Sequence, residues 1–267
     1  MDEGRLELSG SDVVLFDMAA PGVARVRLNR PAARNAIDVE LAAAIQAVVR
    51  RTEEDSSIRA VLLGSATPGM FCAGADLKVV AAGRAAELIR QGDGFAGFTD
   101  APRVKPWIAA VDGAALGGGF ELCLACDMIV ASPRSRFGLP EVRVGLLAGA
   151  GGVRRIARVL PRNVALEVVA TGVPIDAPRA AGLGLVNHLA PPEEVEARAV
   201  ELAVLIAGNA PAAVAGSLAV TRAAGDLDDS DLRALSRKWL DRLMAGPDAK
   251  EGARAFVERR SPRWVGR

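Results

Sequence analysis

Residues 108–125 read IAAVDGAALGGGFELCLA, which is a short apolar run, three consecutive glycines and a second apolar run. We predict a strand over residues 108–111 and a helix over residues 120–125, with the glycines in the turn between them. A glycine cluster at such a turn lets another backbone approach closely and leaves unpaired N–H groups at the helix N-terminus. These groups favour a negative charge, such as a phosphate or an enolate oxygen. The alternative is that the glycines serve the turn alone.

Strand and helix signals also alternate before this stretch. Residues 13–16 and 23–28 lie on either side of a Pro-Gly turn and predict a hairpin. Asp38 is placed to cap a helix that reaches about residue 54, and residues 60–63 predict a buried strand. We expect residues 76–100 to be helical, with interruptions at their glycines.

The pattern changes towards the C-terminus. Residues 128–130 predict a further strand, and the alternation continues to about residue 190, which favours an α/β core with parallel strands and crossover helices. We therefore expect an α/β core over residues 1–191 and a helical region over residues 192–267. The expected C-terminal helices are 193–208, 210–224, 229–244 and 247–258.

Composition excludes several classes of protein. The 267 residues are 51% apolar and 24% charged, so the chain can bury a large core and is not disordered. A net charge of +1 gives no reason to expect a nucleic-acid partner. Acidic residues interrupt the most apolar stretch, 107–131, so we expect no membrane span. Three cysteines and the acidic start Met1-Asp2-Glu3 favour a reducing cytoplasm over secretion.

Two acidic residues stand in apolar surroundings. Glu121 lies within the apolar run that follows the three glycines, and Glu141 lies in the apolar, turn-rich segment 137–142. A buried carboxylate is costly unless it is paired or used in chemistry. General acid–base catalysis is possible if the two side chains converge, and ion pairs with arginine are the alternative.

Other motifs favour structural roles. Cys123 and Cys126 form a C-x-x-C pair, but it lies within an apolar helix and lacks further zinc ligands, so we expect two buried structural cysteines. His188 is the single histidine and follows a strand, which favours a structural role. Asp76 follows a loop of small residues and fits a helix cap. The chain contains no P-loop motif and no complete dinucleotide fingerprint.

Taken together, these segments resemble the crotonase (enoyl-CoA hydratase/isomerase) superfamily. No single motif is decisive, but the pieces follow the family order over nearly the whole chain. The matching segments are residues 29–31, 35–36, 71–77, 105–113, 115–122, 126–127, 137–141, 149–152, 182–186 and 251–260.

The resemblance implies a fold, an assembly and a substrate. The fold would be a spiral of ββα units followed by C-terminal helices that support a homotrimer, or a dimer of trimers, and cover the active site. The substrate would be an acyl-CoA thioester, held without a metal or a redox cofactor. The resemblance assigns the oxyanion-hole N–H groups to Ala75 and Gly118, and the two glutamates of the hydratase branch to Glu121 and Glu141.

Both catalytic glutamates being present favours an enoyl-CoA hydratase. The alternatives are another crotonase-type enzyme, such as an isomerase or an acyl-CoA dehydratase, and a non-catalytic subunit that binds CoA thioesters. Trp107, Asp112 and Val153-Arg154 depart from commoner family residues, and residues 78–100 give no indication of the acyl chain. The CoA contacts that the resemblance implies are Ala73, Gly74, Ala75, Asp76, Leu77, Lys78, Gly117 and Arg259.

Overall fold

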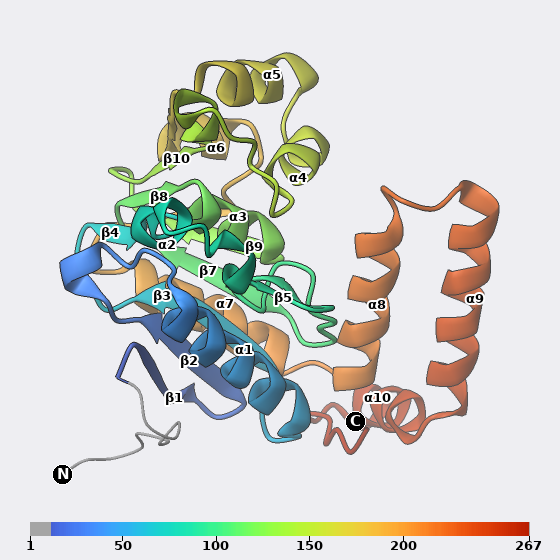
Figure 1. Ribbon diagram of the computed structural model, residues 1–267. Coiled ribbons are helices and arrows are strands. Elements are labelled where there is room, and N and C mark those ends of the chain that lie inside the picture. The colour runs from blue at the N-terminus through green and yellow to red at the C-terminus, as the bar shows by residue number, and fades with distance from the viewer. Residues whose placement is uncertain (1–11, 267) are drawn as a thin grey trace, which may run out of the picture.

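Two β-sheets form the centre of the protein, and helices cover them (Figure 1). The computed structural model describes residues 12–266, so the acidic start Met1-Asp2-Glu3 lies outside it. Within the described residues, the larger sheet has six strands in the order β1-β2-β3-β7-β9-β12. They are β1 (Val14–Ala20), β2 (Val23–Leu28), β3 (Ala60–Ser65), β7 (Trp107–Val111), β9 (Met128–Ala131) and β12 (His188–Leu189).

The larger sheet begins with the expected hairpin and continues with parallel strands. β1 and β2 are antiparallel, with Val14 opposite Leu28, and every later neighbouring pair in this sheet is parallel. Parallel neighbours need crossover connections, and α1 (Val39–Glu54) provides the first. Asp38 caps α1 as expected, because its side chain accepts a hydrogen bond of 2.8 Å from the N–H of Leu41. The prediction of an α/β fold with parallel strands and crossovers is confirmed.

The smaller sheet positions the candidate site. Its strand order is β11-β10-β8-β4, and β4, β8 and β10 run parallel. Parallel strands present their carboxyl ends at one edge of a sheet, so the segments that follow these three strands lie side by side. The elements concerned are β4 (Met70–Cys72), β8 (Ala114–Leu116), β10 (Arg136–Gly138), β11 (Ile175–Asp176), α3 (Gly118–Ala125) after β8, and the 3-10 helix η3 (Pro140–Val144) after β10.

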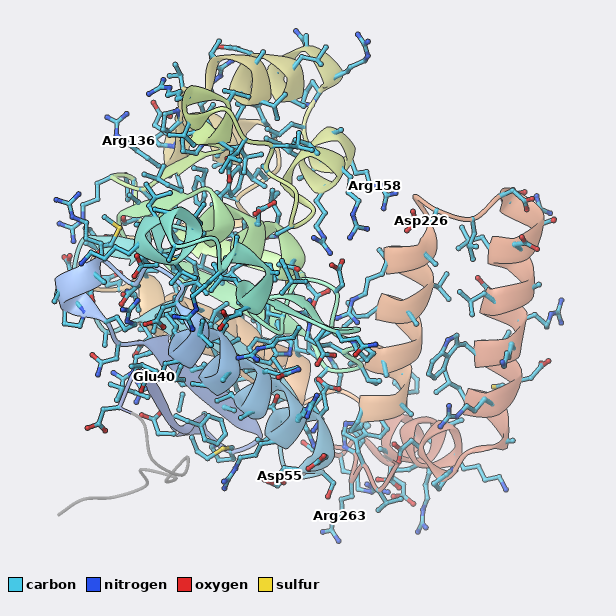
Figure 2. The ribbon with its side chains drawn as sticks, in the orientation of Figure 1. Glu40, Asp55, Arg136, Arg158, Asp226 and Arg263 are labelled. Atoms are coloured by element: carbon cyan, nitrogen blue, oxygen red, sulfur yellow. The ribbon has the colours of Figure 1, made fainter. Side chains whose placement is uncertain are left out.

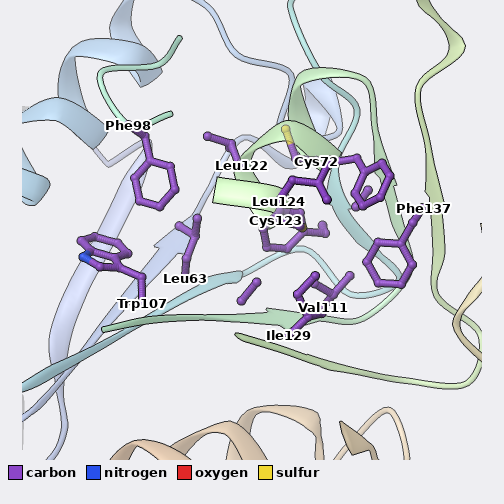
Figure 3. Packing of buried hydrophobic residues seen from close by; sticks show 14 of the residues in the cluster. Leu63, Cys72, Phe98, Trp107, Val111, Leu122, Cys123, Leu124, Ile129 and Phe137 are labelled. Atoms are coloured by element: carbon purple, nitrogen blue, oxygen red, sulfur yellow. The ribbon is translucent and has the colours of Figure 1, made fainter. Parts of the chain in front are cut away.

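Aromatic and aliphatic side chains fill the space around these strands (Figure 3). The rings of Phe98 and Trp107 meet edge to face with centroids 5.0 Å apart. Cys72 and Cys123 are buried among the apolar residues, whereas Cys126 is partly exposed, and all three thiols are free. The expected structural role therefore fits Cys123. Cys126 packs against the same core but is only partly buried as a residue, so the prediction of two buried cysteines is confirmed for Cys123 and in part for Cys126.

Residues 76–100 do not form the helix that we expected. They contain the short helices α2 (Leu77–Ala81) and η2 (Ala85–Leu88), and a small hairpin of β5 (Ile89–Arg90) and β6 (Gly94–Phe95). Gly83, Gly92, Gly94 and Gly97 have φ between +63° and +80°, in the left-handed region that ends a helix. Gly83 therefore separates the two short helices, whereas Gly92, Gly94 and Gly97 lie in the hairpin and the turn after it.

The predicted C-terminal helices are all present but differ in their surroundings. In α7 (Val195–Ala207), Ala199 and Ala203 are buried against the larger sheet. The next three helices extend away from the sheets (Figure 1), so residue 192 does not coincide with the point where the chain leaves the core. The remaining helices are α4 (Gly152–Val159), α5 (Arg162–Thr171), α6 (Ala177–Gly182), α8 (Pro211–Ala223), α9 (Asp229–Ala245) and α10 (Pro247–Glu258).

Among the described residues, no single helix is long and apolar enough to cross a membrane. The helices α7 and α8 together reach that length and composition, but the pair is bent by 109°.

Candidate active site

Three segments meet beyond the carboxyl ends of β4, β8 and β10. They carry Ala75, Gly118 and Glu141 respectively, which are spread over 66 residues of sequence but brought together through the sheet. The N–H of Gly117 donates a hydrogen bond of 2.9 Å to the carbonyl of Gly138, which holds the second segment against the third. Sheet topology therefore assembles the residues that the sequence suggested one by one.

Two backbone N–H groups lie next to each other in this site. A Cβ atom placed on Gly118 would lie 3.4 Å from the N atom of Ala75, and one placed on Gly74 would lie 3.0 Å from the N atom of Gly118. The loop before α2 pairs with Ile37 through the carbonyl of Gly74 and the N–H of Asp76, so this pairing does not use the N–H of Ala75.

The N–H of Gly118 belongs to the first turn of α3, where no intrahelical acceptor exists. Gly74 has φ +96°, and a side chain there would approach the carbonyl of Leu116 to 2.9 Å. The two N–H groups, from Ala75 and Gly118, are candidate donors to one anionic oxygen.

Glu121 is buried on α3 beside these donors, with 3% of its surface exposed. The N–H of Gly152, at the start of α4, donates a hydrogen bond of 2.8 Å to its Oε1 atom. Burial raises the pKa of Glu121 to about 7, the hydrogen bond from Gly152 opposes this rise, and the charge of Glu141 adds to it. A carboxyl with such a pKa can exchange a proton near neutral pH.

Glu141 offers a carboxylate oxygen without a partner. Its Oε2 atom is buried and accepts no hydrogen bond from any described residue, which is uncommon in a native interior. Burial raises its pKa. A Cβ on Gly117 would lie 2.9 Å from Oε1 of Glu141, so the missing side chain at this glycine leaves room for the carboxylate.

The arginine alternative for the two acids is not supported. Within residues 12–266, neither Glu121 nor Glu141 has an arginine within ion-pair distance. The charge of Glu141 instead raises the pKa of Glu121, so the two carboxyl groups lie close enough for one to affect the other.

The implied CoA segment forms the start of α2. Asp76 caps this helix by accepting a hydrogen bond of 3.0 Å from the N–H of Lys78, and it faces Arg30 at 3.6 Å. Lys78 is exposed, as is 60% of Leu77. Arg259 is exposed at the end of α10, which lies apart from α2 in Figure 1. A single chain therefore does not bring Arg259 to this segment, and its contact with CoA stays a prediction.

Other candidate groups lie outside the site. His188 forms part of β12 and pairs with Val130 in the larger sheet, at the strand position that we expected. No three His, Cys, Asp or Glu side chains of the described residues are grouped closely enough to hold a metal ion, so the C-x-x-C pair gains no ligands there.

Sequence reasoning missed two contributors to the site. The glycine cluster at 149–152 was counted among the family segments without a role of its own, yet Gly152 holds Glu121. Phe95 lies in residues 76–100, which were expected to be helical, so the sequence analysis did not assign it to the site. A Cβ on Gly118 would lie 2.6 Å from its ring. A glycine-rich turn that follows a buried acid in sequence was the available signal for Gly152, whereas no local signal marks Phe95.

Comparison with known proteins gives a consistent result. Residues 19–267 match the family described as Enoyl-CoA hydratase/isomerase. A carnitinyl-CoA dehydratase of Proteus mirabilis is 40% identical over 92% of this chain and 95% of its own length. A probable mitochondrial enoyl-CoA hydratase 2 of Arabidopsis thaliana is 34% identical over 97% of this chain and 84% of its own. The crystal structure of an enoyl-CoA hydratase from Mycobacterium tuberculosis superposes with a TM-score of 0.91 at 38% identity, covering 96% of this chain and 100% of that one.

Proposed function

Since this chain belongs to the enoyl-CoA hydratase/isomerase family, we propose that it adds water across the 2,3 double bond of a 2-enoyl-CoA to give a 3-hydroxyacyl-CoA. The observation that carries the proposal is the pair of carboxylates, Glu121 buried and Glu141 with a buried Oε2 atom, without arginine partners and near two backbone donors. A hydration needs one group to take a proton from water and another to deliver a proton to carbon.

The backbone donors act on the thioester oxygen. Water can add to the β-carbon of a 2-enoyl thioester only if negative charge moves onto this oxygen. In the proposed site, the N–H groups of Ala75 and Gly118 donate hydrogen bonds to that oxygen, and the N-terminus of α3 adds its dipole. This stabilises the enolate that forms when the C–O bond is made.

The two glutamates move the protons. Glu121 activates the water: its carboxylate takes one proton as the water oxygen bonds to the β-carbon. Glu141 has the main acid–base role; it enters the step protonated and delivers its proton to the α-carbon as the enolate collapses, and proton exchange within the pair then restores the starting state. The net change is the addition of one water, and the pair titrates as a coupled unit.

The remaining features of the substrate site follow the family. We propose that CoA lies along residues 73–78, with the ammonium group of Lys78 exposed towards it. The chemistry above requires no metal or redox cofactor, because the backbone donors polarise the thioester. We propose the cytoplasm as the compartment, supported by three free thiols.

The test is turnover on crotonyl-CoA and on enoyl-CoAs of increasing chain length. We expect loss of the conjugated enoyl absorbance, and a product heavier by one water in the mass spectrum. The control is the double variant Glu121→Gln with Glu141→Gln, which keeps the volume of both side chains. A pure wild-type protein that binds these esters and turns over none of them contradicts the proposal.

A second candidate is the reverse reaction on a 3-hydroxyacyl-CoA, favoured by the 40% identity to a protein named carnitinyl-CoA dehydratase. The same pair of carboxylates serves both directions, so the preferred acyl group decides the direction in use. Faster loss of water from a hydroxyacyl-CoA than hydration of every enoyl-CoA would support a dehydratase. Movement of the double bond without water uptake would support an isomerase, and binding without turnover a non-catalytic subunit.

We also propose a homotrimer or a dimer of trimers. Phe256 and Val257 on α10 are 85% and 80% exposed in the single chain, and such exposed apolar side chains are suited to an interface. Light scattering coupled to gel filtration should give the mass of three or six chains. A monomeric mass at micromolar concentration contradicts this proposal.

A further inference from the structure

Arg155 lies on α4 and contacts two segments that border the proposed site. Its Nη1 atom donates a hydrogen bond of 3.0 Å to the carbonyl of Ala150. Its Nη2 atom donates to the carbonyl of Thr99 and, at 2.9 Å, to the carboxylate of Asp100. The side chain is 17% exposed, and acceptors from two segments hold the planar guanidinium.

The first segment is the glycine turn that holds Glu121. The guanidinium lies against this turn so closely that a Cβ on Gly151 would be 1.9 Å from Nη1 of Arg155. Gly151 has φ +105°, and the next residue, Gly152, donates its N–H to Glu121. The bond from Arg155 to Ala150 therefore fixes the turn from which the Glu121 carboxylate is held.

The second segment covers the proposed oxyanion donors. The N–H of Phe95 donates a hydrogen bond of 2.9 Å to Oγ1 of Thr99, and the Phe95 ring lies over Gly118. Arg155 donates hydrogen bonds to the same segment, at the carbonyl of Thr99 and the carboxylate of Asp100. One side chain thus links the turn behind Glu121 with the cover over Gly118.

Arg155 also brings a positive charge to Glu121, and this charge lowers the pKa of that carboxyl. Few other charged groups face Glu121. Glu141 approaches from η3 and raises its pKa, and on β4 burial raises the pKa of Cys72 to about 12, so that thiol stays neutral. The strand β8 carries no titratable side chain.

We propose that Arg155 is a positioning residue for the proposed hydration: it holds the turn behind Glu121 and the Phe95 segment in register. The inference rests on the proposed function. It assigns to Arg155 an effect on both catalytic geometry and the protonation of Glu121, without contact with substrate.

The test compares Arg155→Met and Arg155→Lys with the wild type. Arg155→Met removes the hydrogen bonds and the charge, and we expect kcat for hydration to fall roughly 10- to 100-fold, because small displacements of catalytic groups have effects of this size. KM should change much less. The acidic limb of the kcat/KM profile should move to higher pH, since Glu121 loses a neighbouring cation. Arg155→Lys keeps the charge, so its acidic limb should stay in place while kcat still falls.

Arg158→Met is the matched control. Arg158 lies on the same helix and pairs with Asp226 at 2.5 Å, and Figure 2 shows the two side chains facing each other away from the site. Its loss should leave kcat and the pH profile of hydration unchanged. If Arg155→Met behaves like this control, the proposal is wrong.

Two further measurements keep the result decisive. If Arg155→Met does not fold by circular dichroism, Asp100→Asn removes the anionic partner of Arg155, and kcat should fall at least several-fold; an unchanged kcat overturns the proposal. If the wild type hydrates no enoyl-CoA, the proposed function fails separately. In that case, the pKa of Glu121, measured by NMR titration of carbon-13-labelled protein, tests Arg155 independently of activity. The pKa of Glu121 must be higher in Arg155→Met than in the wild type.

Discussion

Glu121 and Glu141 lose most of their hydration in the fold without gaining a cationic partner in direct contact. Glu121 receives one backbone hydrogen bond, and the Oε2 atom of Glu141 receives none from the described residues. Burial of this kind is unfavourable for a carboxylate, so both pKa values rise. The ionised forms of these two residues, for which we propose proton transfer, are therefore less stable in the folded chain than in water.

Replacing each glutamate by glutamine tests the pair directly. Glu121→Gln and Glu141→Gln keep size and shape but cannot exchange a proton, so each should reduce hydration by roughly 10²- to 10⁴-fold. The double variant should lose much less than the product of the two single losses, because the residues act as a unit. Binding of the CoA ester, measured by calorimetry, should survive. A nearly normal Glu121→Gln beside an inactive Glu141→Gln would favour a one-base reaction such as isomerisation.

The raised pKa of Glu121 has a consequence for stability. Between its ordinary value of 4.5 and about 7, the folded chain keeps this proton while the unfolded chain has lost it. The stabilisation of the folded chain by protonated Glu121 is therefore fully present below pH 4.5 and is lost as the pH rises through about 7. Above that pH, Glu121→Gln should raise the free energy of unfolding by roughly 1 to 3 kcal/mol.

Urea unfolding of the Glu121→Gln variant at two pH values provides the measurement. The stabilisation should appear at about pH 8 and be nearly absent at about pH 4.5. An equal effect at both pH values would show that packing, and not ionisation, accounts for the change.

Gly118 offers a matched pair of substitutions for the oxyanion proposal. Gly118→Pro removes the N–H, and proline is tolerated at the first position of a helix. Gly118→Ala keeps the N–H but disturbs Phe95 in the same way, because the added Cβ meets its ring. Hydration by the proline variant should fall roughly 10²- to 10³-fold below that of the alanine variant. Equal rates for the two folded variants would reduce Gly118 to a turn residue.

At the scale of elements, the site depends on which strands are neighbours. β4, β8 and β10 are short, and each is followed directly by a loop that carries one proposed functional group. The fourth support comes from α4, which contributes no side chain to Glu121 but presents the N–H of Gly152. Backbone groups from separate elements thus hold both the proposed oxyanion and the proposed base.

A substitution in α4 tests this support. A Cβ on Gly152 would lie 2.9 Å from Oε1 of Glu121 and 3.0 Å from the Cβ of Ala148, so Gly152→Ala should displace the carboxylate. We expect hydration to fall by about 10²-fold, as a small misplacement of a catalytic group produces. Gly149→Ala is the control, because the nearest atom to its Cβ would be 3.7 Å away. A fully active Gly152→Ala would mean that Glu121 does not need this position.

At the scale of the whole molecule, the chain joins a two-sheet core to helices that extend from it (Figure 1). Arg222 on α8 connects the two parts, since it binds both carboxylate oxygens of Asp127 at 2.7 and 2.8 Å. Asp127 also accepts a hydrogen bond of 2.8 Å from the N–H of Trp107. The ion pair therefore fixes α8 to an edge of the core that contains the largest buried side chain.

Breaking this connection should destabilise the protein measurably. Arg222→Met leaves Asp127, whose side chain is 11% exposed, without its cation, and we expect a loss of roughly 1 to 3 kcal/mol. Arg233→Met on α9 is the control, because Arg233 and Asp229 are 80% and 76% exposed and such pairs contribute less than about 1 kcal/mol. Denaturant unfolding of both variants gives the comparison. Equal stabilities would show that α8 is held by other contacts.

Local patterns were sufficient for much of the fold. The hairpin, the Asp38-capped helix α1 and the four C-terminal helices follow from short-range signals, namely alternation, caps and breakers. The ordered motifs also indicated the family, and Glu121 was notable because a carboxylate stood in an apolar run. These features depend on residues within one or two turns of each other.

Only the tertiary structure decided how the site is assembled. Residues 76–100 are mostly not helical, because Gly83 separates two short helices and a small hairpin follows, with Gly92, Gly94 and Gly97 at positive φ in and after it. The hydrogen bond from Gly152 to Glu121 joins residues 31 apart in sequence. The Oε2 atom of Glu141 is unpaired because none of the described residues around it donates a hydrogen bond to it. Sequence spacing contains neither fact, because burial and hydrogen bonding between distant segments arise only when β4, β8 and β10 pair and α4 packs against α3. The sequence therefore indicated the residues for which we propose chemistry, and strand pairing determined their contacts and their burial.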